Sequence, residues 1–146
     1  MNRKYSVIYW DTSAILSVIF KDIHSDDAVK HSSLQGVHLI SSLAFAETHA
    51  VINRIRREHL AEDVIIEAAL EGLETGPWRR LNIGPDISKI KKLSSKWSLR
   101  GADLWHLASA KTLQKELPEL TMLTYDKKLY TASAGEGLIQ KKRDKT

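Results

Sequence analysis

Short apolar runs alternate with longer segments of helical periodicity along this chain. Four of the runs have the length and the β-branched or aromatic composition of buried strands. They are SVIYW before Asp11, HLIS around Ile40, RRLNI around Leu81 and TMLTY before Asp126. Helix-like segments, rather than hairpin turns, separate these strands. The pattern therefore predicts an α/β fold, a three-layer α/β/α sandwich with a central, mainly parallel sheet of four or five strands.

Six of the segments that separate the strands carry helix start or stop signals, such as a hydroxyl residue at the start or Gly or Pro at the end. They are TSAILSVIF, SDDAVKHSSLQ, SLAFAETHAVINRIRREHL, AEDVIIEAALEGLE, PDISKIKKLSSKW and ADLWHLASAKTLQKEL. Ser42 is the expected N-cap of the third segment. Ligands of open parallel sheets bind at the carboxyl ends of the strands. Asp11 and Asp126 lie at two of these strand ends.

The composition of the 146 residues limits the possible chemistry. The chain has no cysteine, which excludes disulfides, thiolate metal sites and thiol nucleophiles. The sequence also lacks the motifs of P-loop, dinucleotide-binding and serine-hydrolase proteins. A net charge of +4 gives a mild preference for polyanionic partners.

We expect a single domain over residues 1–140, followed by a basic tail at residues 141–146. No apolar stretch approaches the length of a membrane span, and the N-terminus lacks the pattern of a secretory signal. The sequence therefore predicts a soluble, cytoplasmic protein with no membrane association.

The two helical segments between Ser42 and Glu74 carry more apolar positions than one face of a small sheet needs. Core packing and an interface with a partner both account for this surplus, and the sequence leaves the two open. The positions are Ile55, Leu60, Val64, Ile65, Ala68 and Leu73.

Glu47 lies in a helical segment, on the face that the apolar pattern assigns to the core. Its neighbours three and four residues away include Leu43, Ala50 and Val51. Taken alone, Glu47 is explained by a boundary position with a nearby Arg or Lys as its partner. Helix capping does not explain it, because Glu47 lies in the middle of the segment.

Three further acids, Asp11, Asp103 and Asp126, lie at the starts of helix-like segments. A helix N-terminus stabilises negative charge, so capping explains each of them when it is considered alone. Together with Glu47, however, they could all face one end of a parallel sheet. Clustered carboxylates repel one another unless a cation neutralises them, and Mg²⁺ and Mn²⁺ prefer carboxylate oxygen. His49 and His106 lack the spacing of zinc ligands and are expected to pack or form hydrogen bonds.

In these features the chain resembles the PIN-domain ribonucleases, especially the VapC-like toxins of bacterial and archaeal toxin–antitoxin pairs. The resemblance is carried by DTSAI at Asp11, SSLAFAETHAV with Glu47, RGADLWHLASA with Asp103 and LTYDKKL with Asp126. It implies a PIN-like fold and an acidic pocket that binds one or two Mg²⁺ or Mn²⁺ ions. It also implies that these four acids are the catalytic and metal-binding residues.

Other positions match the family only in part. Ser13 and Thr124 match small hydroxyl residues that would support the pocket, whereas Lys127 and Lys128 replace a further acid that many relatives carry near the last strand. The number of metal ions therefore stays open. Basic residues that could bind RNA beside the acids, or simply be solvated, are Arg54, Arg57, Arg79 and Arg80, and also Arg56, Lys89, Lys91 and Lys92.

The resemblance implies a metal-dependent endoribonuclease, the toxin of a type II toxin–antitoxin system. Its implied partners are the RNA substrate, a second copy of the chain in a homodimer, and a small VapB-like antitoxin. Two alternatives remain open from the sequence. One is a PIN nuclease that acts in RNA processing or on DNA without an antitoxin. The other is a non-catalytic RNA-binding or scaffold module whose acids serve stability.

Overall fold

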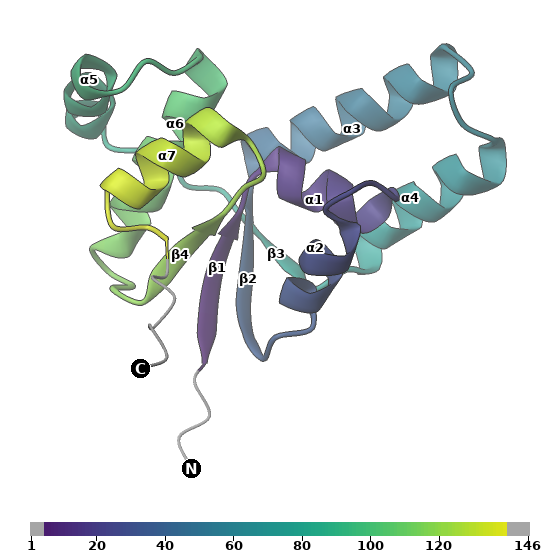
Figure 1. The fold of residues 1–146 in the computed structure, drawn as a ribbon, viewed down its shortest axis with the longest axis horizontal. Coiled ribbons are helices and arrows are strands. Elements are labelled where there is room, and N and C mark those ends of the chain that lie inside the picture. The colour runs from purple at the N-terminus through teal and green to yellow at the C-terminus, as the bar shows by residue number, and fades with distance from the viewer. Residues whose placement is uncertain (1–4, 140–146) are drawn as a thin grey trace.

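The computed structural model describes residues 5–139, and a parallel sheet of four strands lies at its centre (Figure 1). The strands are β1 (Ser6–Trp10), β2 (Gly36–Ser41), β3 (Trp78–Leu81) and β4 (Leu120–Leu123). Their order is β3-β2-β1-β4, and every pair of neighbours is parallel. The four predicted strands and the predicted α/β/α class are therefore confirmed.

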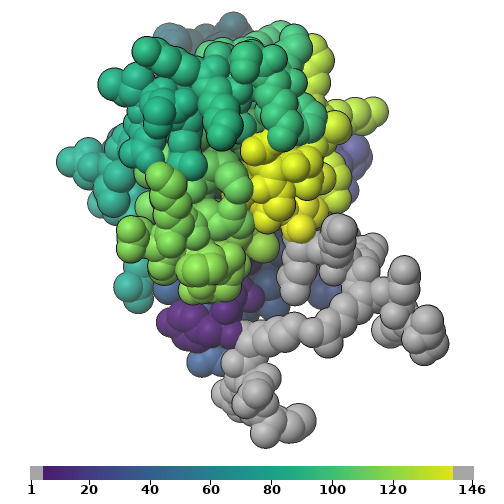
Figure 2. All heavy atoms as spheres, turned by 90° about the vertical axis from the view of Figure 1, so that its left-hand side faces the viewer, coloured from purple at the N-terminus to yellow at the C-terminus, as the bar shows by residue number. Residues whose placement is uncertain are grey.

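Seven helices of the described residues form the two outer layers. They are α1 (Thr12–Ile19), α2 (Ser25–Ser32), α3 (Ser42–Arg57), α4 (Asp63–Thr75), α5 (Ile87–Lys96), α6 (Gly101–Gln114) and α7 (Lys127–Gly135). Figure 1 shows α1 to α4 on one side of the sheet and α5 to α7 on the other. Figure 2 shows α7 packed beside the α5–α6 segment on that second side.

Strand β1 is buried on both faces, which explains why it is a continuous apolar run rather than an alternating one. Val7 and Tyr9 pack into the core beneath α6 and α7, whereas Ile8 and Trp10 pack into the core beneath α1, α3 and α4. All four side chains are at most 5% exposed. The first predicted acid, Asp11, follows this buried strand directly.

The start of α3 differs from the prediction. Ser41, not Ser42, is the N-cap, because its hydroxyl accepts a hydrogen bond from the Ala44 amide at 3.0 Å. The Ser42 hydroxyl instead donates to the carbonyl of Leu81 at 3.0 Å. Ser41 is also the last residue of β2, so the chain passes from strand to helix without a loop.

The buried stripe of α3 also differs from the prediction. Its fully buried residues are Ala44, Thr48 and Ile52. The Thr48 hydroxyl donates to the carbonyl of Ala44 at 2.7 Å, so a polar residue can occupy the core without an unpaired group. Glu47 therefore lies at the border of the stripe, half-buried.

The apolar surplus of α3 and α4 is divided between the core and the surface. Leu73 lies in the core and Ile55 packs against it. Leu60, Val64 and Ile65, where the chain turns from α3 into α4, are exposed by 68%, 70% and 46%. Figure 1 shows this end of the two helices extending beyond the sheet.

No helix within residues 5–139 is both long and apolar enough to cross a membrane. The predicted basic tail, residues 141–146, lies outside the described residues.

Candidate active site

The four predicted acids lie around one end of the sheet. Asp11 directly follows β1, and Asp126 comes after Thr124 and Tyr125 at the end of β4, the parallel neighbour of β1. Glu47 lies in the second turn of α3, which starts at the end of β2. Asp103 lies in the first turn of α6. The crossover connections of a parallel sheet therefore bring together residues from four separate elements.

Asp11 is buried, and both of its carboxylate oxygens accept hydrogen bonds. Oδ1 accepts from the Ser13 hydroxyl at 2.7 Å and from the Ala14 amide at 2.9 Å, which makes Asp11 the N-cap of α1. Oδ2 accepts from the Thr124 hydroxyl at 2.6 Å. Burial raises the pKa of the Asp11 carboxyl, and the hydrogen bonds from Thr124 and Ser13 act in the opposite direction.

Ser13 and Thr124 connect the ends of β1 and β4. Besides donating to Asp11, Thr124 Oγ1 accepts the Asp126 amide at 3.1 Å, and Ser13 Oγ accepts the Tyr125 amide at 3.0 Å. Asp126 also caps α7. The two hydroxyls thus fix Asp11 and Asp126 relative to each other, while their role in supporting a metal pocket stays a prediction.

Glu47 is held through one of its two oxygens. Oε1 accepts from the Thr12 hydroxyl at 2.8 Å and from Nε2 of His106 at 3.0 Å. The partner of this acid is therefore a histidine and a threonine, and not the Arg or Lys expected from the sequence. The His106 hydrogen bond lowers the pKa of Glu47 more than burial raises it, so the carboxylate stays ionised.

Asp103 and Asp126 line one pocket of about 500 Å³. No side chain caps α6, and no hydrogen bond within residues 5–139 reaches the Asp103 carboxylate, so capping does not explain this acid. Burial raises the pKa of Asp103, and the negative charges of Asp126 and Glu47 raise it further. Asp126 and Glu47 therefore both lie close enough to Asp103 to repel its negative charge.

The donors of this site suit a hard divalent cation. All are carboxylates, and a cation would relieve the repulsion at Asp103. Within the described residues, however, no three His, Cys, Asp or Glu side chains are close enough to ligate one ion together. Mg²⁺ usually keeps several waters and contacts only one or two carboxylates of the protein. The residues therefore fit a hydrated ion at Asp103 and Asp126 rather than a closed cage.

Three basic residues that the sequence reasoning did not assign to the site also line this pocket: Arg100, Lys127 and Lys128. None of them forms an ion pair with a described residue. Their sequence positions offered a signal, since two follow Asp126 directly and the third precedes Asp103 by three residues.

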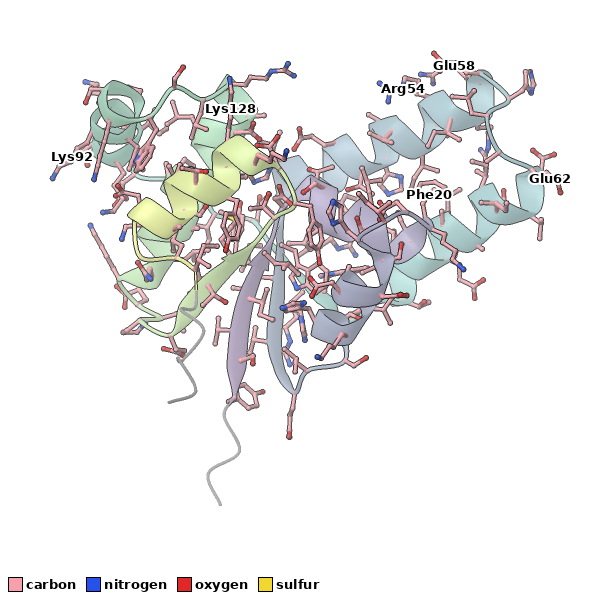
Figure 3. All side chains as sticks on the ribbon, in the orientation of Figure 1. Phe20, Arg54, Glu58, Glu62, Lys92 and Lys128 are labelled. Atoms are coloured by element: carbon pink, nitrogen blue, oxygen red, sulfur yellow. The ribbon has the colours of Figure 1, made fainter. Side chains whose placement is uncertain are left out.

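The residues that were predicted to bind RNA do not line the pocket. Arg54 and Arg57 belong to the last turn of α3, and Figure 3 shows Arg54 beyond the sheet and away from Lys128. Arg79 and Arg80 lie on β3, at the opposite edge of the sheet from β4. Binding of RNA by these four arginines stays a prediction.

The sequence model of the PIN domain family matches residues 8–134, a segment that contains all four acids. The chain therefore belongs to the PIN domain family. Proteins of this family are nucleases, and they generally use divalent metal ions. No curated protein sequence is similar enough to this chain to count as a match.

Two solved structures have a similar fold. PAE2754 from Pyrobaculum aerophilum has a TM-score of 0.63 and 17% sequence identity, covering 89% of this chain and 81% of its own. VapC20 from Mycobacterium tuberculosis, described as a sarcin-ricin loop cleaving toxin, has a TM-score of 0.57 and 16% identity. That match covers 86% of this chain and 94% of VapC20. At such identities the likeness concerns the fold.

Proposed function

We propose that this protein is an endoribonuclease that hydrolyses RNA phosphodiester bonds with Mg²⁺ or Mn²⁺. The observation that carries the proposal is the pocket shared by Asp103 and Asp126, next to Glu47, in a chain that belongs to a nuclease family. Like charges that raise the pKa of a neighbour form an environment in which a divalent cation binds favourably.

Each acid has a distinct task in this proposal. Asp103 and Asp126 would hold the ion, and the second oxygen of Glu47 would contact it through a bound water, which this oxygen would also orient for attack. A bound ion supplies a water of lowered pKa and offsets charge on the phosphate. Asp11 has both oxygens engaged by the protein, so it fixes the end of β4 through Thr124 and contributes negative charge.

The basic residues of the pocket bind the substrate. RNA that approaches several carboxylates is repelled unless positive charge is nearby. Arg100, Lys127 and Lys128 supply that charge within the same pocket, and no ion pair with the described residues engages them. We assign to them the phosphate oxygens on either side of the bond that is cut.

The proposed biological role is that of a toxin in the cytoplasm, with a small antitoxin protein as partner and a homodimer as the working form. The similarity of the fold to VapC20, described as a toxin, supports this role. Copurification with the product of an adjacent small reading frame is the expected observation. A cleaving protein that copurifies with no such product would instead favour an RNA-processing nuclease.

The central test compares the wild type with Asp103→Asn in the cleavage of a fluorescently labelled RNA, with Mn²⁺ and with EDTA. Asp103 is the best variant, because its side chain accepts no hydrogen bond from the described residues and Asn has the same size. We expect cleavage only by the wild type with Mn²⁺. The control is Asp86→Asn, which removes an exposed acid outside the pocket and should cleave as the wild type does.

Equal cleavage by Asp103→Asn, after contaminating nuclease is excluded, would refute the assignment. Calorimetric titration with Mn²⁺ distinguishes a scaffold from an enzyme, because acids that serve only stability give no saturable binding. A single-stranded DNA of the same sequence tests the substrate class: we expect RNA to be cut and DNA to stay intact.

A further inference from the structure

A buried histidine lies between the candidate site and the core. Nδ1 of His106 is 2.8 Å from the hydroxyl of Tyr9 on β1, and its Nε2 is 3.0 Å from Oε1 of Glu47 on α3. The His106 side chain is 2% exposed and Tyr9 is fully buried, whereas Glu47 is 34% exposed. The three side chains thus run from the centre of the sheet to the edge of the site.

The hydrogen bonds determine which ring nitrogen of His106 carries the proton. The ionised Glu47 carboxylate can only accept, so Nε2 must donate. Nδ1 of a neutral ring is then an acceptor, and the Tyr9 hydroxyl donates to it. Burial raises the pKa of Tyr9 well above its ordinary value, so that hydroxyl keeps its proton.

These hydrogen bonds engage only one of the two carboxylate oxygens of Glu47. Thr12 and His106 both donate to Oε1, and no donor among residues 5–139 reaches Oε2. One oxygen is therefore fixed in place while the other stays available. Glu47 is also close enough to Asp103 for its charge to raise the Asp103 pKa, so the available oxygen belongs to a carboxylate of the shared acidic site.

We propose that His106 is a positioning residue of the nuclease site. Tyr9 anchors Nδ1 of its ring, and the ring holds Oε1 of Glu47 so that Oε2 is presented to the metal or to its water. His106 itself touches neither substrate nor ion. The inference rests on the proposed function, because it assigns Glu47 to the nuclease reaction. Residues that orient metal ligands in this way are as much a part of a site as the ligands.

A second buried histidine provides a matched control. His38 on β2 accepts from the Trp10 indole at 3.0 Å through Nδ1, and its Nε2 lies 2.9 Å from the carbonyl of Leu34. Its position between an aromatic donor and an oxygen acceptor matches that of His106, but its acceptor is a backbone carbonyl. Loss of the His38 ring should therefore affect stability alone.

The experiment measures Mn²⁺ affinity by calorimetry, RNA cleavage as kcat and KM, and thermal unfolding. His106→Leu removes the donor at similar size and should weaken Mn²⁺ binding about 10- to 100-fold, the usual effect of losing an outer contact of a metal site. The value of kcat should fall while KM for RNA changes little. His106→Gln, which can still donate to Oε1, should lie closer to the wild type than His106→Leu does.

His38→Leu should lower the unfolding temperature but keep the wild-type Mn²⁺ affinity and kcat. Tyr9→Phe provides a further arm if His106→Leu does not fold, because it keeps the ring but removes the hydrogen bond that anchors its Nδ1, and it should reduce kcat. Nitrogen-detected NMR of the metal-free wild type should show a His106 ring that is protonated on Nε2.

The outcomes separate two failures. A wild type that neither binds Mn²⁺ nor cuts RNA overturns the proposed function. A wild type that does both, together with folded His106→Leu or Tyr9→Phe that equals it in Mn²⁺ affinity and kcat, overturns the positioning role alone. A His106 ring protonated on Nδ1 alone would also overturn it, because Nε2 could then not donate to Glu47.

Discussion

Asp103 and Glu47 affect folding in opposite directions, although both belong to one acidic site. Burial and the charges of Asp126 and Glu47 raise the pKa of Asp103, so its ionised form is disfavoured in the folded chain. The pKa of Glu47 is lowered, chiefly by the His106 hydrogen bond, so its ionised form is favoured. Removing the charge of Asp103 should therefore stabilise the folded protein, although the same change should abolish cleavage.

Asp103→Asn is expected to unfold at a higher temperature than the wild type in EDTA, by about 2–4 °C for each kcal/mol of repulsion that is relieved. Its RNA cleavage should fall by more than about 100-fold, because the loss of a metal ligand should cost more than the loss of an outer contact. Calorimetry and the cleavage assay measure the two effects. Asp86→Asn is the control, and it should be no more stable than the wild type, because it loses an ion pair with Lys115. An Asp103→Asn protein that is less stable than the wild type would contradict the electrostatic argument.

The pH dependence of stability should differ between the same two acids. The pKa of Asp103 is raised by folding, so without metal the wild type is less stable than Asp103→Asn at pH 8. The difference should shrink as the pH falls through the raised pKa toward the ordinary value of 3.8. Glu47→Gln should be less stable than the wild type at pH 8, and this gap should close only below the ordinary value of 4.5, because the folded pKa is lowered.

Urea unfolding in EDTA at several pH values measures both gaps. Adding Mn²⁺ at about 100 times its Kd should stabilise the wild type by about 2.7 kcal/mol. The same addition should leave Asp103→Asn nearly unchanged. A gap between wild type and Asp103→Asn that is independent of pH would show that charge is not its cause.

The junctions between strands and helices hold the site together. After β1 and after β4, an acid caps the next helix, and the Ser13 and Thr124 hydroxyls join the two junctions. Asp11 and Asp126 can therefore cap their helices and at the same time belong to the acidic site. The same backbone position that ends a strand also presents its side chain at the ligand-binding edge of a parallel sheet.

Thr124→Val should lower the free energy of unfolding by about 1–3 kcal/mol, because it leaves the Asp126 amide and one oxygen of Asp11 without a partner. Cleavage should fall as well, since the Thr124 hydrogen bond lowers the pKa of Asp11. Chemical denaturation gives the first quantity. Thr121→Val, on the same strand but with no side-chain hydrogen bond to a described residue, should stay within about 0.5 kcal/mol of the wild type. Equal losses in the two variants would reject the role of the hydroxyl.

The chain has a small overall excess of positive charge, and some of this charge is concentrated beside the acids of the pocket. The net charge of +4 says little by itself, but three basic residues line the same pocket as two of the acids. The residues first expected to bind RNA lie elsewhere, on α3 and β3. A polyanion is therefore expected to meet its closest positive charges beside the acids.

Lys128→Ala should make RNA binding less dependent on salt. In the Asp103→Asn background, which should bind without cutting, the slope of log affinity against log salt should fall by about 0.7 for each lost contact with a single strand. Fluorescence anisotropy across a salt series measures this slope. Lys92→Ala is the control, because Figure 3 shows Lys92 on the outside of α5, away from Lys128. Equal slopes for both variants would remove Lys128 from the binding surface.

Much of the fold and the identity of the acids could be predicted from local pattern. Strand β1 was found because SVIYW is a short apolar run that is buried on both faces. Strand β3 is less buried than the sequence predicted, because Arg79 and Arg80 are exposed. The buried stripe of α3 was misplaced because it includes a polar residue, Thr48, which satisfies its hydroxyl within its own helix. The position of Arg100 and Lys128 in the pocket was missed because basic residues on helix surfaces give no periodic signal.

The sequence by itself determined the order of strands and helices and the positions of four acids, because periodicity and end signals act between residues a few positions apart. Only the tertiary structure decided which groups meet. Thr124 reaches Asp11 across 113 residues of chain, and His106 reaches Glu47 across 59. No local pattern encodes such contacts, because they arise when the crossover connections of a parallel sheet bring separate strand ends to one edge.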